Sequence, residues 1–374
     1  MKKILVFIFL SLMLTGCGNE SKEDVLKKFT DSINSTKSYK LTGTMEISND
    51  EETFTYSLES YYLKDNYYKV ILVNQTNNHE QIILKNNEDI YVITPALNKS
   101  FKFQSEWPGN SSQAYLLGSL VTDIKNDGGV EINESEDGYI IKSSVNYPNN
   151  EELTYQKIYL TKDKNVEKVE VFNKTDIVKI KVTFNSVDLK ANLKESDFKL
   201  DDYIKEEDTP DEKSEKEIEN TICTEDNKET CKQENQNITE EKPEKNNLNN
   251  QTNTEETTNI ENIIYPLYIP SNTYLTSSET IETTRGNRVI LTFSGEKNFV
   301  LIEEVTIKAD EMEIVPVYGE PLMLSETIGA LSANSLSWDV NNISYYLAST
   351  ELTVNEMQTI ANSLGNTTLV NAIK

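Results

Sequence analysis

The chain has 374 residues, of which 37% are hydrophobic and 26% charged, and this length allows two ordinary domains. Its net charge of −26 excludes the basic surface that binding to nucleic acid needs, and disfavours a protein that lies flat on anionic lipid. A single histidine, His79, excludes a zinc site with two histidine ligands. We therefore expect neither a metal nor a cofactor.

Residues 1–16 have the layout of a secretory signal peptide. Two lysines precede an apolar run (4–13) that is too short to cross a bilayer as a helix. The segment ends at Leu14-Thr15-Gly16-Cys17, which resembles the lipobox of bacterial lipoproteins. The resemblance implies cleavage before Cys17 and attachment of acyl chains such as palmitate, which would anchor the protein at the extracytoplasmic face of the cell membrane. The alternative is a plain signal peptide with an incidental cysteine.

A helix is predicted over 24–35, after a lipidated tether (17–23). Ser21 is a candidate N-cap, with Asp24 three residues later in a spacing that is typical of a capping box. The apolar residues of the helix form one stripe, made of Val25, Leu26, Phe29 and Ile33.

From Tyr39 onward the apolar period changes to two, which is typical of half-buried strands. Asn- and Asp-rich turns separate short strands, and this pattern predicts an antiparallel meander. The strands are expected at 39–47, 54–58, 67–73, 81–84, 90–94, 101–103, 130–132, 139–145, 153–160, 166–172 and 177–187. A second helix is predicted over 111–124.

Residues 24–204 are therefore predicted to form an α+β domain, in which a curved antiparallel sheet, an open half-barrel, carries helices on its concave face. An antiparallel sheet with one apolar face must be covered, and the two helices are the available cover. The hollow of such a sheet suits a hydrophobic ligand. The alternative is a hollow that side chains fill.

His79 lies in the polar stretch Asn77-Asn78-His79-Glu80, which indicates a hairpin turn. A solvated loop histidine is the favoured interpretation over a catalytic base. No catalytic residue is predicted, because a Ser-His-Asp or Cys-His arrangement would depend on this histidine alone.

Residues 205–258 are predicted to be an acidic, disordered linker. They carry 17 acidic and 7 basic side chains and few apolar ones, so they bury too little surface to offset chain entropy. Cys223 and Cys231 lie in this segment. The chemistry of an exported chain leaves two options open for them, a disulfide that closes a small loop or two exposed thiols.

Residues 259–374 are predicted to form a small α+β domain whose reach the linker sets. The Pro-punctuated stretch 263–270 is expected along a sheet edge. Strands are expected at 288–293, 299–306, 312–318, 320–324 and 330–334, followed by a hairpin over 335–347. A helix over 353–364 begins at Thr353, with Glu356 at the capping-box position.

The order of these elements resembles the LolA/LolB/RseB superfamily of envelope lipoproteins and lipoprotein carriers. The matching sequence runs from Val25-Leu26-Lys27-Lys28-Phe29 through Ser38-Tyr39-Lys40-Leu41-Thr42-Gly43 to Val187. The C-terminal part resembles the small domain that follows this fold in lipoproteins of spore-forming Gram-positive bacteria, by Tyr268-Ile269-Pro270, Leu291-Thr292-Phe293-Ser294-Gly295, Trp338, 345–347 and the helix start at Leu352. The long acidic linker departs from the superfamily's pattern.

The resemblance implies a non-enzymatic protein of the cell envelope with a link to sporulation or germination. Such a protein would bind a lipid or acylated ligand, or dock an envelope partner protein, while it is held at the membrane. The alternative function is an RseB-like sensor that acts on a membrane-bound regulatory protein. An enzyme is the least favoured interpretation, because the sequence shows no clustered catalytic residues and no phosphate-binding loop.

Overall fold

The computed structural model describes residues 21–49, 52–87, 89–203, 259–284 and 286–364. The described residues before 204 and after 258 belong to one compact unit. The expected signal peptide (1–16) and linker (205–258) lie outside the described residues.

Helix α2 (Lys22–Asn34) confirms the first predicted helix and its cap. The Ser21 hydroxyl accepts a hydrogen bond from the backbone N–H of Asp24 at 3.1 Å. Val25, Phe29 and Ile33 are buried on the predicted stripe. The helix packs against α3 (Leu117–Asn126) and β7 (Glu131–Glu134). Its apolar stripe therefore closes one side of the hydrophobic core that the large sheet and α3 form.

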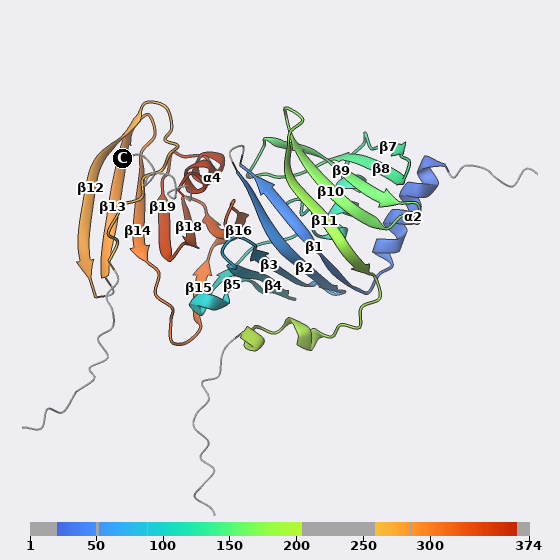
Figure 1. Ribbon diagram of the computed structural model, residues 1–374, viewed down its shortest axis with the longest axis horizontal. Helices are drawn as coiled ribbons and strands as arrows, with labels where there is room; N and C mark the ends of the chain where they lie inside the picture. The colour runs from blue at the N-terminus through green and yellow to red at the C-terminus, as the bar shows by residue number, and fades with distance from the viewer. Residues whose placement is uncertain (1–20, 50–51, 88, 204–258, 285, 365–374) are drawn as a thin grey trace, which may run out of the picture. The chain divides into compact units, whose positions relative to one another are not determined.

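A twelve-stranded sheet confirms the predicted meander (Figure 1). Its order is β15-β6-β5-β4-β3-β2-β1-β11-β10-β9-β8-β7, so that β11 returns to pair with β1. The described residues before 204 form the first part of the chain and supply every strand of this sheet except β15 (Glu313–Val317). Besides β7, these strands are β1 (Ser38–Ser48), β2 (Thr53–Leu63), β3 (Tyr67–Asn74), β4 (Glu80–Asn86), β5 (Asp89–Thr94), β6 (Lys99–Phe103), β8 (Gly138–Ser144), β9 (Leu153–Thr161), β10 (Val166–Asn173) and β11 (Val178–Asp188). The sheet is open and curved, with helices on its concave face, as the sequence predicts. Three short 3-10 helices accompany it, η1 (Pro95–Leu97), η2 (Glu195–Phe198) and η3 (Leu200–Tyr203).

The alternation along β1 shows how this sequence selects the inner face of the sheet. Tyr39, Leu41 and Met45 are buried, and the side chains between them are partly exposed. Gly43 occupies the remaining inward position opposite Phe184, next to a bulge where the register with β11 shifts between Thr42 and Gly43. A Cβ atom at Gly43 would lie 2.2 Å from the Thr183 carbonyl oxygen, so only glycine fits this approach.

The second predicted helix is too long by six residues at its start. α3 begins at Leu117, and residues 111–116 are non-helical. The Ser112 N–H donates to the Asn146 carbonyl, and the Ser112 hydroxyl accepts from the Asn146 N–H and donates to Oδ1 of Asp123, each at 2.7 Å. These long-range bonds hold residue 112 in an extended conformation that a helix would break, and periodicity cannot reveal them.

A seven-stranded sheet forms the C-terminal part, in the order β12-β13-β14-β19-β18-β17-β16. Its strands are β12 (Thr273–Thr283), β13 (Gly286–Gly295), β14 (Phe299–Val305), β16 (Gly319–Met323), β17 (Ile328–Ser332), β18 (Ser335–Val340) and β19 (Ile343–Ala348). The predicted β18–β19 hairpin is confirmed, with positive φ at Asn341 (51°) and Asn342 (62°). β12 was not predicted, because most of its residues are exposed and show no inward stripe.

Strand β15 (Glu313–Val317) corrects the prediction that this stretch continues the C-terminal sheet. It pairs in parallel with β6, with Val315 opposite Phe101, and so forms an edge of the twelve-stranded sheet. The C-terminal part therefore packs against the first part, and the expectation that the linker sets its reach is wrong for the described residues.

The stretch 263–270 also differs from its prediction. The backbone N–H of Ile264 donates to Glu303 of β14, an inner strand, so the stretch does not follow a sheet edge. Ile263 and Ile264 pack against the core of the C-terminal part, which removes part of their apolar surface from water.

Helix α4 (Val354–Asn362) confirms the last predicted helix and its start. The Thr353 hydroxyl accepts from the Glu356 N–H at 3.2 Å, and the Glu356 carboxylate accepts from the Thr353 N–H at 2.8 Å, a complete capping box. Met357, Ile360 and Ala361 are buried in the hydrophobic core of the C-terminal part, so the opposite face of α4 points away from that core.

Candidate functional site

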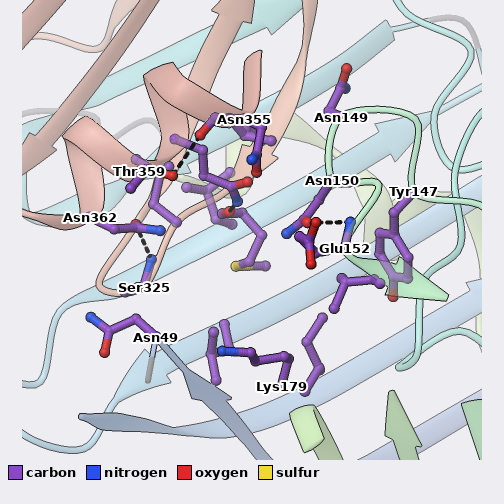
Figure 2. A pocket seen from close by; sticks show the side chains of 18 of the residues that line it. Asn49, Tyr147, Asn149, Asn150, Glu152, Lys179, Ser325, Asn355, Thr359 and Asn362 are labelled. Carbon is purple, nitrogen blue, oxygen red and sulfur yellow. Dashed lines mark hydrogen bonds between the residues drawn. The ribbon is translucent and has the colours of Figure 1, made fainter. Parts of the chain in front are cut away.

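A cavity of about 690 Å³ lies between the twelve-stranded sheet and the β16–α4 region of the C-terminal part (Figure 2). This volume is within the range of about 300–1,000 Å³ that is typical of small-molecule sites. Its walls come from α4, from the loop over residues 147–152, and from β16. Asn49, which follows β1, and Lys179 and Ile180 at the start of β11 complete the lining on the side of the sheet.

The α4 wall consists of uncharged polar side chains. Asn355, Gln358, Thr359, Asn362 and Ser363 line the cavity on the face opposite the buried stripe. In Figure 2, Asn355, Thr359 and Asn362 lie on one side of the cavity, across from Tyr147, Asn149 and Asn150. The wall therefore presents amides and hydroxyls.

Several of these amides are held in place by one hydrogen bond and keep other polar atoms available. Asn362 Oδ1 accepts from the Ser325 N–H at 2.9 Å, and Gln358 Nε2 donates to the Met323 carbonyl at 2.7 Å. Within the described residues, no hydrogen bond fixes the side-chain amide of the exposed Asn355. The wall thus offers both donors and acceptors, and those of Gln358 and Asn362 are held in position.

The opposite wall is joined to β16 by a carboxylate. Glu320 accepts hydrogen bonds from the side-chain amides of Asn110 and Asn149, which belong to loops of the first part. Asn150 Oδ1 accepts from the Glu152 N–H at 3.3 Å and so shapes the same loop. These contacts connect the two sides of the cavity at one end.

The charged groups of the lining have partners within the protein. Glu152 pairs with Lys174 at 3.3 Å, and Glu320 is bound by its two amides. Lys179 also interacts with another group of the protein. Among the described residues of the lining, each charged side chain is therefore engaged by another group of the protein.

Apolar side chains form the inner surface of the cavity. They include Ile83, Leu153, Ile180, Leu322, Leu324 and Ile328. The aromatic residues of the lining are Trp107, Tyr115, Tyr147 and the partly exposed Tyr268. A ligand here would meet apolar surface on one side and amides on the other.

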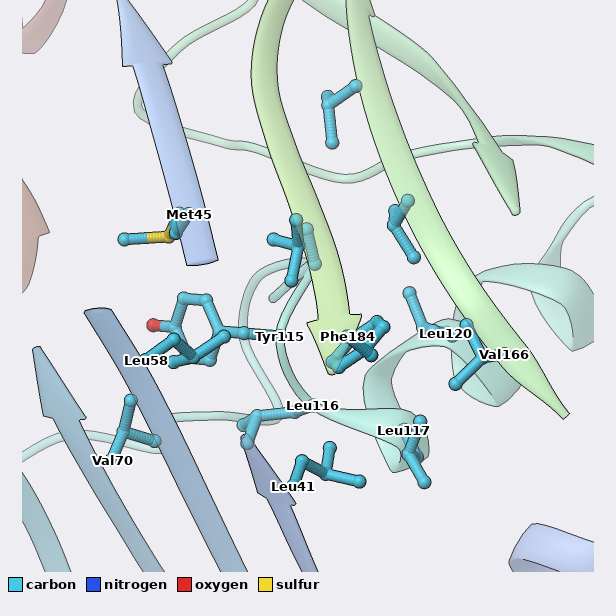
Figure 3. Packing of buried hydrophobic residues seen from close by; sticks show 14 of the residues in the cluster. Leu41, Met45, Leu58, Val70, Tyr115, Leu116, Leu117, Leu120, Val166 and Phe184 are labelled. Atoms are coloured by element: carbon cyan, nitrogen blue, oxygen red, sulfur yellow. The ribbon is translucent and has the colours of Figure 1, made fainter. Parts of the chain in front are cut away.

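The concave face of the large sheet is filled by side chains, which is the second of the two options that the sequence leaves open. Figure 3 shows Tyr115, Leu116, Leu117 and Leu120 lying against Leu41, Met45, Leu58, Val70 and Phe184 of the sheet. Tyr115 is 5% exposed, and Leu116 and Leu117 are 1% exposed. This packing leaves the cavity at the β16–α4 side as the candidate site.

His79 lies in the β3–β4 loop, as predicted, but the expectation that it is solvated is wrong. Its Nε2 atom is buried and, within the described part of the chain, has no hydrogen-bond partner. Burial lowers the pKa of the imidazole, and the Asp339 carboxylate of β18 opposes this shift. The C-terminal part supplies this environment, which the local sequence cannot show.

The predicted lipid-attachment residue, Cys17, and the cysteines of the linker, Cys223 and Cys231, lie outside the described residues. Within the described ranges, no helix is long and apolar enough to cross a membrane. The same ranges contain no cluster of three His, Cys, Asp or Glu side chains that is arranged to hold a metal ion.

The sequence does contain a signal for the α4 wall, which hydrophobic periodicity alone overlooks. The helix has an apolar stripe, and the opposite face carries Asn355, Thr359 and Asn362 with no charged residue between them in that row. In a chain with 26% charged residues, a solvent-facing row is expected to carry lysine or glutamate. The loop over residues 147–152 shows no comparable signal.

The chain matches the family model described as "Sporulation protein YdcC-like" over residues 1–198. It is 32% identical to sporulation protein YdcC of Bacillus subtilis (strain 168) over 354 residues, which cover 94% of this chain and 93% of that protein. The family match covers the strands of the large sheet from β1 to β11 and ends before the C-terminal part.

Solved structures give weaker likenesses. One is the MucA/MucB complex of Pseudomonas aeruginosa, with 9% identity, TM-score 0.29, and coverage of 91% of this chain and 96% of that chain. Another is a LolA superfamily protein of Nitrosomonas europaea, with 10% identity, TM-score 0.29, and coverage of 48% and 97%. A third is the complex of the CwlD amidase with the GerS lipoprotein of Clostridioides difficile, with 19% identity, TM-score 0.28, and coverage of 45% and 96%. TM-scores this low carry no argument about function.

Proposed function

The chain belongs to the sporulation protein YdcC-like family, and on this basis we propose that it is a membrane-anchored binding protein with a role in sporulation. Cys17 is the proposed point of lipid attachment, and the folded part is proposed to lie on the extracytoplasmic side of the cell membrane. We propose that the protein binds its ligand without chemical conversion.

The observation that carries this proposal is the cavity between the large sheet and α4. It has the volume of a ligand site, an apolar inner surface and fixed polar groups on its walls. The concave face of the large sheet is packed with side chains, so the ligand, acylated or not, is proposed to occupy this cavity.

The anchor is tested by the change Cys17→Ser in the full-length chain. Loss of the sulfur removes the attachment site for acyl chains, each of which contributes about 0.8 kcal/mol per buried methylene. Fractionation of sporulating cells should find the unchanged protein with membranes and the variant in the soluble fraction, with the same melting temperature. Membrane retention of the variant would refute the proposed anchor.

The binding function is tested on the unchanged protein extracted from the membranes of sporulating cells. Native mass spectrometry should detect a species heavier than the lipidated chain, which loses the added mass under harsher ionisation. Protein that is consistently free of any bound molecule would count against the binding function.

A further inference from the structure

We propose that the ligand of the cavity is an uncharged glycan segment, held by the amides of α4 and by the apolar inner surface. This inference rests on the proposed function, because it names the chemical class that the same cavity binds. Three features of the cavity support it: its charge, its polar groups and the strand edge beside it.

The charge of the lining disfavours ionic ligands. Glu152 and Glu320 are engaged by groups of the protein, and Lys179 has an interaction of its own. An incoming anion would also meet a chain with a net charge of −26. Fatty-acid carboxylates, phosphorylated headgroups and acidic peptides are therefore poor occupants.

The polar groups of the walls match hydroxyl and acetamido groups. A side-chain amide donates and accepts, so Asn355, Asn362 and Gln358 can pair with groups that do both. Sugars carry several such groups on one ring and keep their apolar C–H faces for packing. Tyr268, 38% exposed, and the apolar inner surface supply the complementary contacts.

The edge strand at the cavity disfavours an extended peptide. β16 is the last strand of its sheet, and a bound peptide would normally pair with such an edge. Pro321 has no N–H to donate, and the Met323 carbonyl already accepts from Gln358. An occupant that uses side-chain amides and ring faces fits this wall better than one that needs backbone pairing.

The test titrates the full-length protein with two uncharged glycans, tetra-N-acetylchitotetraose and maltotetraose, and follows binding by calorimetry. Asn355→Ala should weaken binding about fivefold to tenfold, because it removes one or two hydrogen bonds while leaving the fold intact. Asn133→Ala, the same change at an exposed position of β7, should leave the affinity unchanged. Palmitate and an uncharged tetrapeptide are titrated in parallel.

Binding of either glycan with this dependence on Asn355 supports the proposal. Failure of both glycans to bind, or glycan binding that Asn355→Ala leaves unchanged, overturns it. If palmitate or the peptide binds instead and the Asn355→Ala change weakens that binding, the glycan inference fails while the binding function stands. If native mass spectrometry also finds no bound molecule, the proposed function itself fails.

Discussion

Glu303 is the residue whose environment departs most from that of an ordinary glutamate. Its side chain is fully buried in β14, Oε2 accepts from the Ile264 N–H at 3.2 Å, and Oε1 has no partner among the described residues. Burial raises the pKa of this carboxyl to about 7, against the opposing effect of the Ile264 N–H. Between about pH 4.5 and pH 7, the Glu303 carboxyl is therefore protonated in the folded protein and ionised in the unfolded chain.

This environment predicts a pH dependence of stability. The pKa of Glu303 is 4.5 in the unfolded reference and about 7 in the folded protein. Because the folded state binds more protons in this window, stability falls as pH rises from about 4.5 through 7 and then levels off. The contribution of Glu303 to this loss is on the order of 3 kcal/mol.

Glu303→Gln should remove that contribution, since glutamine keeps an acceptor for Ile264 and does not titrate. Urea denaturation at pH 5 and pH 8 should show the variant gaining stability relative to the unchanged protein as pH rises. A variant with the same pH slope as the unchanged protein would show that Glu303 is already ionised in the fold.

At the residue scale, the sequence predicted what depends on neighbours in the chain. The Ser21 and Thr353 caps and the buried stripe of α2 follow from spacings of three and four residues. The surroundings of His79 and Glu303 include the Asp339 carboxylate and the Ile264 N–H, which are remote in sequence. No local pattern contains such contacts.

At the scale of elements, strand β15 joins the two parts of the described chain. Its parallel pairing with β6 is supported by Asn98, whose side-chain amide donates to the Ala309 carbonyl at 2.7 Å. Gln81 of β4 adds a second connection. Its Oε1 accepts from the Ile328 N–H at 2.6 Å and from the Thr327 hydroxyl at 3.0 Å. The position of the α4 wall therefore depends on buried polar contacts.

Gln81→Met should destabilise the protein by about 1–3 kcal/mol, because it leaves the buried N–H of Ile328 without an acceptor. Gln75→Met is the matched control, since the Gln75 side chain is exposed and bonds only weakly to Ser57 (3.3 Å); its effect should stay within about 0.5 kcal/mol. Urea denaturation of the full-length variants measures both values. Equal stability of the two variants would contradict this role for Gln81.

Most elements were predictable because hydrophobic period and turn residues are local properties. The meander, the β18–β19 hairpin and α4 follow from them. The partner strand of β15 was not predictable, since a five-residue strand carries no signal for the sheet that it joins. The predicted start of α3 was wrong for a similar reason. The N–H of Ser112 donates to the carbonyl of Asn146, which is remote in sequence, and not to a carbonyl within a helix.

At the scale of the whole molecule, the open curved sheet was predictable, because it follows from the order of the elements along the chain. The link to sporulation that the sequence resemblance implies agrees with the family match. The candidate site was not predictable, because it combines loops of the first part with β16 and α4. Only the uncharged face of α4 is visible in the sequence. We infer that the ligand occupies this composite cavity.

Two threonine-to-tryptophan variants test whether the composite cavity holds the ligand. Thr359 of α4 lines the cavity, and Thr122 of α3 is exposed elsewhere; the hydroxyl of each donates to the carbonyl four residues earlier, at 2.8 and 2.9 Å. Thr359→Trp places an indole in the cavity, whereas Thr122→Trp places one in solvent.

Native mass spectrometry of both full-length variants, extracted from the membranes of sporulating cells, measures the fraction that carries the bound molecule. We predict that Thr359→Trp lowers the affinity for this molecule about tenfold or more, because a steric cost of about 1.4 kcal/mol corresponds to a tenfold loss. Thr122→Trp should keep the occupancy of the unchanged protein. Equal occupancy in the two variants would contradict the assignment of the cavity as the binding site.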